Sequence, residues 1–239
     1  MAPHTLLRAA VANNAAWCDA VCRSHRYPGE FTARTWLSPR HDLPFYPNAI
    51  TLGPDATAAD TQAARDPGRA YGVKDSFARL DLAAEGLTPL FDADWIACDP
   101  ALPERPPVES PDWKAVDDVA GLVRWETAWA GDDEVTGLFQ PALLADPGCA
   151  ILGFYRDGAL AGGAIAYTAA GVTGISNMFT ASLPDGVPAP ATLWRSALRA
   201  AAALRPGSPV VGYEHGENLA AAREAGGQLL GPLRVWTRG

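Results

Sequence analysis

The sequence is short of positive charge. Nineteen lysine and arginine residues stand against 27 aspartate and glutamate residues, which gives a formal net charge of -8 at pH 7. An acidic protein gains no electrostatic attraction to nucleic acid or to an anionic membrane surface. The chain also has no run of basic residues interleaved with aromatic residues. We therefore expect neither nucleic acid nor a membrane among its partners.

Long apolar runs are missing as well. No stretch approaches the roughly 20 apolar residues that a membrane-spanning helix needs. The N-terminal segment has no apolar core long enough for a signal peptide, because Asn13 and Asn14 interrupt it and no cleavage pattern follows. We therefore expect a cytoplasmic protein.

Cysteine is scarce. The four cysteines, Cys18, Cys22, Cys98 and Cys149, are too few and too scattered for a disulfide framework. Cys18, Cys22 and His25 share one face of a helix, but a zinc site needs a fourth ligand and usually tighter spacing. Buried thiols on an apolar helix face are the alternative, which we favour, and we predict no metal site.

What is abundant is apolar sequence with frequent turn residues. The 239 residues are 48% hydrophobic, enough for one large domain or two small ones. Prolines and glycines are spread along the chain except in residues 99–111, which hold five prolines. Such density favours an extended linker. We therefore predict an N-terminal unit over 1–98, the linker over 99–111 and a C-terminal domain over 112–239.

Periodicity and turn signals place the elements of the N-terminal part. Apolar residues at three- and four-residue steps predict a helix over 5–23, in which Asn14 is the polar exception. The remaining segments predict strands over 31–37, 48–52, 71–76 and 88–97, and helices over 58–65 and 77–85.

The C-terminal part shows a clearer order of elements. Asp157-Gly158 is a hairpin signal between two apolar alternating runs. The predicted strands are 113–116, 149–155, 160–168, 172–180, 210–214 and 228–236, and the predicted helices are 119–130, 138–144, 191–204 and 218–225. A proline- and glycine-rich loop fills 182–190.

A pattern of strand, helix, glycine and strand occurs twice. It covers 71–97 and returns at 210–236, at an offset of about 140 residues, with Gly86 matching Gly226. Few residues are identical between the two copies. The repetition still indicates two related half-units, and we predict an α/β fold with mixed sheets.

The order of elements over about 113–239 resembles that of the GNAT superfamily, the acyl-CoA-dependent N-acyltransferases. The resemblance implies a mixed, mostly antiparallel sheet flanked by helices, with a smaller, incomplete related unit before it. In that family the acyl-CoA arm lies in a gap between the fourth and fifth strands, here 172–180 and 210–214. Backbone N–H groups of the loop and helix after the fourth strand bind the pyrophosphate. The implied co-substrate is acetyl-CoA or another acyl-CoA.

The resemblance also implies positions that bind the co-substrate. They are Asn177, Met178, Phe179 and Thr180 on the fourth strand, Gly186 and Val187 in the loop, and Asn218 at the start of the next helix. Two features depart from the family. Its loop usually reads Arg/Gln-x-x-Gly-x-Gly/Ala, whereas 185–190 reads Asp-Gly-Val-Pro-Ala-Pro, and proline lacks an N–H donor. The tyrosine that the family often places four residues before the helix-ending glycine is here Ala222.

Candidate catalytic and substrate residues each have a structural alternative. Glu214 and His215 end the fifth strand beside the expected gap, and either is a candidate base for an acceptor amine, or else a polar strand end. The predicted acceptor site holds Trp125, Glu126 and Trp129, for which core packing with an exposed glutamate is the alternative. Polar Asn177 marks either a bulge or a side chain in the gap.

Two functions follow from this reading. The first is direct acyl transfer from an acyl-CoA to an amine, and the acceptor amine belongs to a small molecule or a peptide. The second is a GNAT-shaped protein that has lost catalysis and serves as a binding or regulatory module. The strand order and Asn218 favour the first, and the atypical 185–190 loop favours the second.

Overall fold

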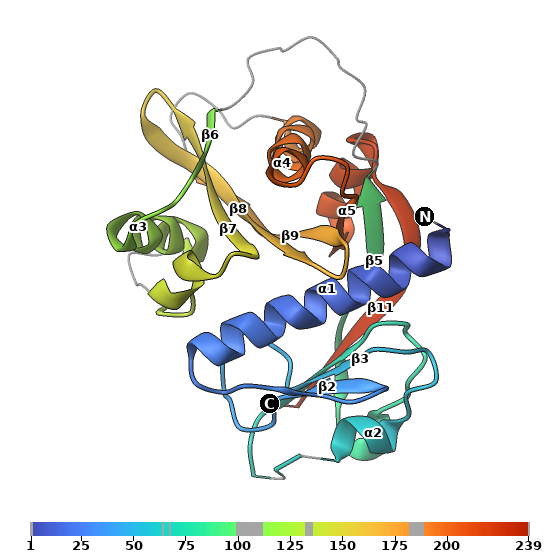
Figure 1. Cartoon of the computed structure of the whole chain (residues 1–239). Helices are drawn as coiled ribbons and strands as arrows, with labels where there is room; N and C mark the ends of the chain where they lie inside the picture. Colours follow the sequence, from blue (N-terminus) through green and yellow to red (C-terminus); the bar gives the residue numbers. More distant parts are fainter. Residues whose placement is uncertain are drawn as a thin grey trace.

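One continuous sheet forms the centre of the molecule (Figure 1). The computed structural model describes residues 2–63, 65–66, 68–98, 112–131, 136–181 and 189–238. Eleven strands lie in the order β1-β2-β3-β4-β11-β5-β10-β9-β8-β7-β6. The predicted linker over 99–111 lies outside the described residues.

The strands of the C-terminal part agree closely with the sequence pattern. Residues Val172–Thr180 and Val210–Glu214 form strands with the predicted bounds. The full set is β1 (Glu30–Phe31), β2 (Thr35–Leu37), β3 (Ala49–Thr51), β4 (Tyr71–Asp75), β5 (Thr88–Cys98), β6 (Asp112–Ala115), β7 (Cys149–Arg156), β8 (Ala159–Ala169), β9 (Val172–Thr180), β10 (Val210–Glu214) and β11 (Gln228–Arg238). Among the described strands, neighbours are antiparallel except for β3–β4 and β9–β10. The predicted mixed, mostly antiparallel α/β (α+β) fold is therefore confirmed.

Helices cover both faces of this sheet. The helical elements are α1 (Pro3–Ser24), α2 (Ala58–Gln62), η1 (Ala83–Glu85), α3 (Val119–Ala130), η2 (Pro141–Ala145), α4 (Pro190–Leu204) and α5 (Gly216–Glu224). The long α1 crosses the front of the sheet in Figure 1. Ile165 of β8 packs in the cluster that α1 and α3 share, whereas its neighbours Ala164 and Ala166 pack with α4 and α5. Alternate residues of the central strands are therefore buried on opposite faces, as their strongly apolar sequence requires.

The two halves of the chain exchange their closing strands. β4 and β10 are each parallel to a strand of their own half, β3 and β9 respectively. The antiparallel neighbour of β4, however, is β11, and that of β10 is β5. β5 and β11 also pair with each other in the middle of the sheet. This arrangement agrees with the repeated sequence pattern, while the division of the chain at 99–111 stays a prediction.

The prediction of a helix over 77–85 is wrong for most of that range. Only the 3₁₀-turn η1 forms there, followed by Gly86 in the left-handed conformation with a φ of 74°. The Asp75 carboxylate accepts hydrogen bonds from the backbone N–H groups of Phe77 and Leu80, and Ala78 has a φ of 49°. These bonds satisfy the backbone in a turn, which competes with a helix.

Smaller differences also have local causes. The strand expected over 31–37 is split into β1 and β2, because the Thr32 hydroxyl accepts from the N–H groups of Arg34 and Thr35 and turns the chain. The helix expected over 138–144 is the 3₁₀-helix η2, which begins at Pro141. Within the described ranges, no helix has the length and apolarity needed to cross a membrane.

Candidate active site

The parallel strands β9 and β10 part after two pairs of residues. Thr173 and Gly174 pair with Val210 and Val211, and no later residue of β9 pairs with β10 in the described part of the chain. At Gly212 the strands are still close, since a Cβ there would lie 2.9 Å from the carbonyl oxygen of Ile175. Beyond this point the β10 side of β9 presents backbone groups that pair with no strand among the described residues. The gap predicted between these strands is present.

A bulge in β9 lies beside this gap. Ile165 of β8 is opposite Ser176 and Gly163 is opposite Phe179, so two residues of β9 face one residue of β8. Asn177 has a φ of 52° and lines the pocket, while its Nδ2 donates to the Ser176 hydroxyl over 3.0 Å. The two alternatives for Asn177 are therefore both correct. The bulge turns this side chain into the pocket.

A pocket of about 530 Å³ opens at the gap. Its walls come from α1, the 41–48 loop, β4, β5, the end of α3, β9, β10, the start of α5 and β11. Tyr213 and Glu214 are successive residues of β10 and point to opposite faces of the sheet, yet both line the pocket. The pocket therefore extends through the opening between β9 and β10. Its size is within the usual range for sites that hold small molecules.

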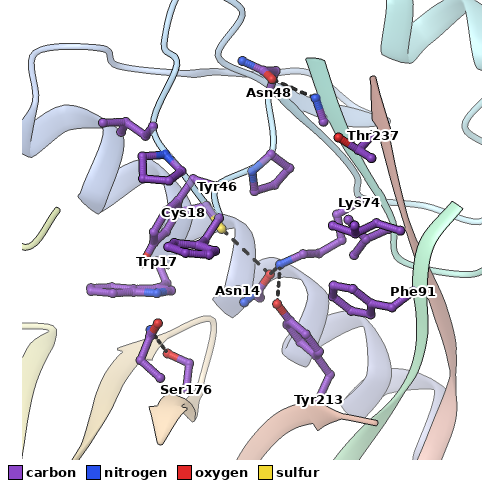
Figure 2. Close-up of a pocket in the computed structure, with 18 of the residues that line it drawn as sticks. Asn14, Trp17, Cys18, Tyr46, Asn48, Lys74, Phe91, Ser176, Tyr213 and Thr237 are labelled. Carbon is purple, nitrogen blue, oxygen red and sulfur yellow. Dashed lines mark hydrogen bonds between the residues drawn. The ribbon is translucent and has the colours of Figure 1, made fainter. Parts of the chain in front are cut away.

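The 41–48 loop closes the pocket on the side of α1. His41 is buried, and burial lowers its pKa, so the ring is neutral at neutral pH. Its Nδ1 accepts from the N–H of Leu43 over 3.2 Å, which leaves Nε2–H to donate to the carbonyl oxygen of Pro47. The Asn48 side chain donates to the carbonyl oxygens of Ser38 and His41, and it accepts from the N–H of Gly72 (Figure 2). The loop is held in shape without any ligand.

Glu214 is the titratable carboxyl group at the β10 end of the pocket. Burial raises its pKa from 4.5 to about 7, against the opposite effect of hydrogen bonds from the Asn218 side chain and the His215 backbone. His215 is exposed, precedes α5 as its N-cap residue and stacks on Phe91 with ring centroids 5.0 Å apart. Only Glu214 of the two candidate bases therefore sits in a desolvated position. A carboxyl group with a pKa near neutrality is well matched to proton transfer at physiological pH.

The wall on the α1 side holds a buried lysine. Lys74 of β4 is 4% exposed, and its Nζ donates to Asn14 Oδ1 over 2.7 Å and to the Tyr213 hydroxyl over 3.1 Å. Nζ also lies 4.5 Å from the centre of the Tyr213 ring. Figure 2 shows the three side chains meeting in the pocket from β4, α1 and β10. Asn14, the polar exception of the first helix, is thus part of the pocket wall.

Sequence reasoning missed Lys74. The chain contains two lysines, Lys74 and Lys114, and Lys74 lies inside an otherwise apolar strand sequence. A rare cation among buried positions was a signal available in the sequence. The partner residues were not readable, because Asn14 and Tyr213 are about 60 and 139 positions away.

The predicted acceptor residues are placed differently from one another. Trp125 is fully buried, donates to the Leu152 carbonyl oxygen and does not line the pocket. Glu126 is 2% exposed rather than exposed, and its Oε1 accepts from the Thr136 hydroxyl and from the N–H groups of Leu138 and Phe139. Trp129 does line the pocket. Of these three residues, the structure brings only Trp129 to the site.

Of the residues expected to bind the co-substrate, some line the pocket and others do not. Met178 and Asn218 line the pocket beside Asn177. Phe179 packs edge-on against Trp125, and Thr180 is exposed at the end of β9. Gly186 and Val187 lie outside the described residues. Ala222 is fully buried, so no phenol occupies the position at which the family often has one.

The cysteines are not grouped as metal ligands. Cys18 and Cys22 are buried, and burial raises the pKa of both thiols. His25 bonds to the Leu138 carbonyl oxygen. Over the ranges that the structure describes, no three side chains of His, Cys, Asp or Glu converge as metal ligands would.

Solved structures share this fold at low sequence identity. Neither the family models nor the curated proteins give a match to the sequence. A GCN5-related N-acetyltransferase from Kribbella flavida has 15% identity and a TM-score of 0.57, with 93% of this chain and 94% of that chain covered. An acetyltransferase from the GNAT family of Colwellia psychrerythraea has 13% identity and a TM-score of 0.51, covering 87% of this chain and 83% of its own.

A third structure carries no assigned function. It is a functionally unknown conserved protein from Staphylococcus epidermidis, with 8% identity, a TM-score of 0.59, and coverage of 91% of this chain and 96% of that one. At these identities the likeness concerns the fold. Because it extends over more than nine tenths of this chain and of two of these proteins, it includes both halves of the chain and not the C-terminal part alone.

Proposed function

The chain has a divergent GNAT fold, and from this premise we propose that it transfers an acyl group from an acyl-CoA to an amine. The observation that carries the proposal is the opening between β9 and β10, which leads into a pocket of about 530 Å³ with Glu214 in its wall. The acceptor is a small molecule or a peptide. Acetyl-CoA is the simplest donor, and acyl chains of other lengths belong to the same proposal.

The residues around the opening fit an acyl-CoA arm. After Gly174, the edge of β9 that faces β10 has backbone groups available to an extended ligand. At Gly212, where the gap begins, there is no room for a Cβ beside β9, and Asn218 lines the pocket. The helix α4 starts at Pro190 without a side-chain cap. Pro190 has no N–H, and the N–H groups of Thr192 and Leu193 donate to the Ala189 carbonyl oxygen, so in the first turn only the Ala191 N–H has no partner within the described residues and could meet an anion such as a pyrophosphate. Pro190 itself is a normal first helical residue.

Glu214 supplies the base in this proposal. A carboxyl group with a pKa of about 7 is half ionised at neutral pH and can take a proton from a bound ammonium group. The neutral amine then attacks the thioester carbonyl carbon, a C–N bond forms and the C–S bond breaks. The attacking nitrogen loses its second proton to water, and the departing thiolate takes up a proton from water, since Ala222 offers none. The products are an amide and free CoA.

A second function has a specific observation in its favour. The sequence over 185–190 has an acidic residue and two prolines where the family usually has a cation or amide and two glycines. Proline cannot donate an N–H to a phosphate, and a carboxylate repels one. A GNAT-shaped module that binds a ligand without acyl transfer would show this pattern.

Titration with acetyl-CoA separates the two functions. On our proposal, ligand at about 100 times its dissociation constant raises the free energy of unfolding by about 2.7 kcal/mol, seen as a higher melting temperature. Propionyl-, butyryl- and octanoyl-CoA extend the series. Glu214→Gln is the matched control, because it should keep the thermal shift and lose the release of CoA in the presence of amines. No shift with any of these acyl-CoAs at millimolar concentration would contradict the proposal.

A further inference from the structure

The Lys74 ammonium is a buried cation without an opposite charge. Its polar partners are an amide oxygen and a phenol, and no carboxylate pairs with it among the described residues. The Cys18 thiol lies close to the same Asn14 oxygen, but burial raises its pKa, so it is neutral at neutral pH. Burying a charge is costly unless it is paired. A buried, unpaired ammonium group at a pocket wall is therefore suited to bind an anionic group of a ligand.

The groups around Lys74 are donors that still lack acceptors. The ammonium has three N–H donors, of which two are occupied. Asn14 accepts through Oδ1, and no partner for its Nδ2 is found within the described ranges. The Tyr213 hydroxyl accepts from Lys74 and keeps its own proton to donate. The complement of this wall is a group that only accepts hydrogen bonds.

Tyr46 adds a further donor to the same pocket. Its side chain is 9% exposed, and its hydroxyl has no hydrogen-bond partner in the part of the chain that the structure describes. The Asn177 side chain, which also lines the pocket, lies near enough to interact weakly with this hydroxyl, but not in normal hydrogen-bond geometry. A buried hydroxyl without a well-formed hydrogen bond is unfavourable in the empty protein, and a ligand acceptor removes that cost.

We infer that the amine acceptor of the proposed reaction carries a carboxylate, which Lys74 binds together with Asn14, Tyr46 and Tyr213. This inference rests on the proposed function for the identity of the ligand as an amine. A single buried cation with neutral donors suits a group with one negative charge better than a phosphate with nearly two. The acceptor is therefore of the amino-acid class.

The position of the base agrees with such a ligand. Glu214 follows Tyr213 directly in β10, and although the two side chains point to opposite faces of the sheet, both line the pocket. The anion site and the base therefore belong to one cavity. Aromatic side chains of Trp17, Phe91 and Trp129 line the rest of the pocket and suit an apolar amino-acid side chain.

The test measures binding of product-like ligands and needs no turnover. We would titrate the N-acetyl derivatives of glycine, alanine, leucine and phenylalanine, each against its carboxamide, and follow tryptophan fluorescence and melting temperature. Trp17 and Trp129 line the pocket and report its occupation. The inference expects at least one acid to bind tenfold or more tightly than its carboxamide. If no acid of the four pairs binds more tightly than its amide, the inference is wrong.

Two variants and a matched control locate the effect. Lys74→Met removes the cation, and Asn14→Asp keeps Lys74 but pairs it with an internal carboxylate, so both should abolish the preference for the acid. The control is Lys114→Met, the same change at the other lysine, which lies on β6 beside Tyr155 outside this pocket. It should leave the preference unchanged. A preference that survives Lys74→Met and Asn14→Asp would assign the carboxylate to another site and overturn the inference.

Stability provides an independent readout. Because Lys74 is an unpaired buried charge, ligand-free Lys74→Met should melt no lower than the wild type, whereas a purely structural lysine would lower the melting temperature on removal. The outcome is also separate from that of the acyl-CoA titration. Carboxylate binding without any response to acyl-CoA would refute the enzyme and keep the anion site. Acylation of amines without a preference for carboxylates would support the enzyme and refute the anion site.

Discussion

Replacement of Glu214 by glutamine removes one proton-binding group and changes little else in shape. In the unfolded chain this carboxyl group has its ordinary pKa of 4.5, and in the folded protein burial raises it to about 7. The folded state therefore binds the proton more tightly. The stability that this group contributes is complete below pH 4.5 and is lost as the pH rises through 7. Glutamine has no such dependence.

The size of the effect follows from the two pKa values. Each factor of ten in proton affinity corresponds to about 1.4 kcal/mol, so the stability of the wild type should fall relative to Glu214→Gln by about 2.5 kcal/mol between about pH 5 and about pH 8. This is an upper limit, because the side chain is partly open to water. The variant should be the more stable protein at alkaline pH.

Urea unfolding followed by tryptophan fluorescence measures this difference at a series of pH values. All other titrating groups are common to both proteins and cancel in the comparison. A constant difference between wild type and variant from about pH 5 to about pH 8 would refute the elevated pKa. If amines are acylated, kcat/KM of the wild type should rise with pH and level off above 7, and the variant should lose about 100-fold or more. His215→Ala should keep this pH dependence; its loss there would move the base to His215.

Three further substitutions test the surroundings of the site. Gly212→Ala should lower the free energy of unfolding by about 1–3 kcal/mol, because its Cβ would meet the Ile175 carbonyl oxygen at 2.9 Å; an unchanged urea midpoint would contradict the close approach of β9 and β10. Asn13 donates through Nδ2 to three backbone carbonyl oxygens of β8 and β9, so Asn13→Asp should cost at least about 2 kcal/mol in thermal unfolding at neutral pH. Equal stability of Asn13→Asp and the wild type would show that these hydrogen bonds do not fix α1 to the sheet. Glu126→Ala should cost about 3 kcal/mol while Glu126→Gln keeps most of the stability, since three donors converge on Oε1. A changed KM for the amine at unchanged stability would instead indicate that Glu126 contacts the substrate.

Local pattern was sufficient for most of the C-terminal elements. Strands β9 and β10 and helix α3 have the bounds that the sequence predicts, because long apolar stretches between strong turn signals leave few alternatives. The prediction of a helix over 77–85 was wrong for a reason that hydrophobic periodicity cannot reveal. Its residues have acceptable helix propensity, but the Asp75 side chain captures two backbone N–H groups and turns the chain.

The site itself could be predicted only where it follows from strand order. Glu214 and Asn177 were identifiable because they stand at the ends or irregularities of strands beside the expected gap. Lys74 is recognisable as a rare cation in an apolar strand sequence, but its place in the site and that of Tyr46 could not be predicted, since both come from the other half of the chain and reach the pocket through the tertiary fold. Trp125 and Trp129 are one helical turn apart, yet one is in the core and the other in the pocket. Their spacing alone does not distinguish these positions.

The exchanged closing strands have a consequence for how the protein is made. When β5 leaves the ribosome, neither of its partners exists, because β10 and β11 lie roughly 110 residues or more further along the chain. The N-terminal half therefore cannot complete its sheet during its own synthesis and exposes an apolar strand that contains Trp95 and Ile96. The sheet can therefore be completed only after β10 and β11 have been synthesised. For the same reason, two fragments cut within 99–111 should each be incomplete alone and should restore a native sheet when they are expressed together.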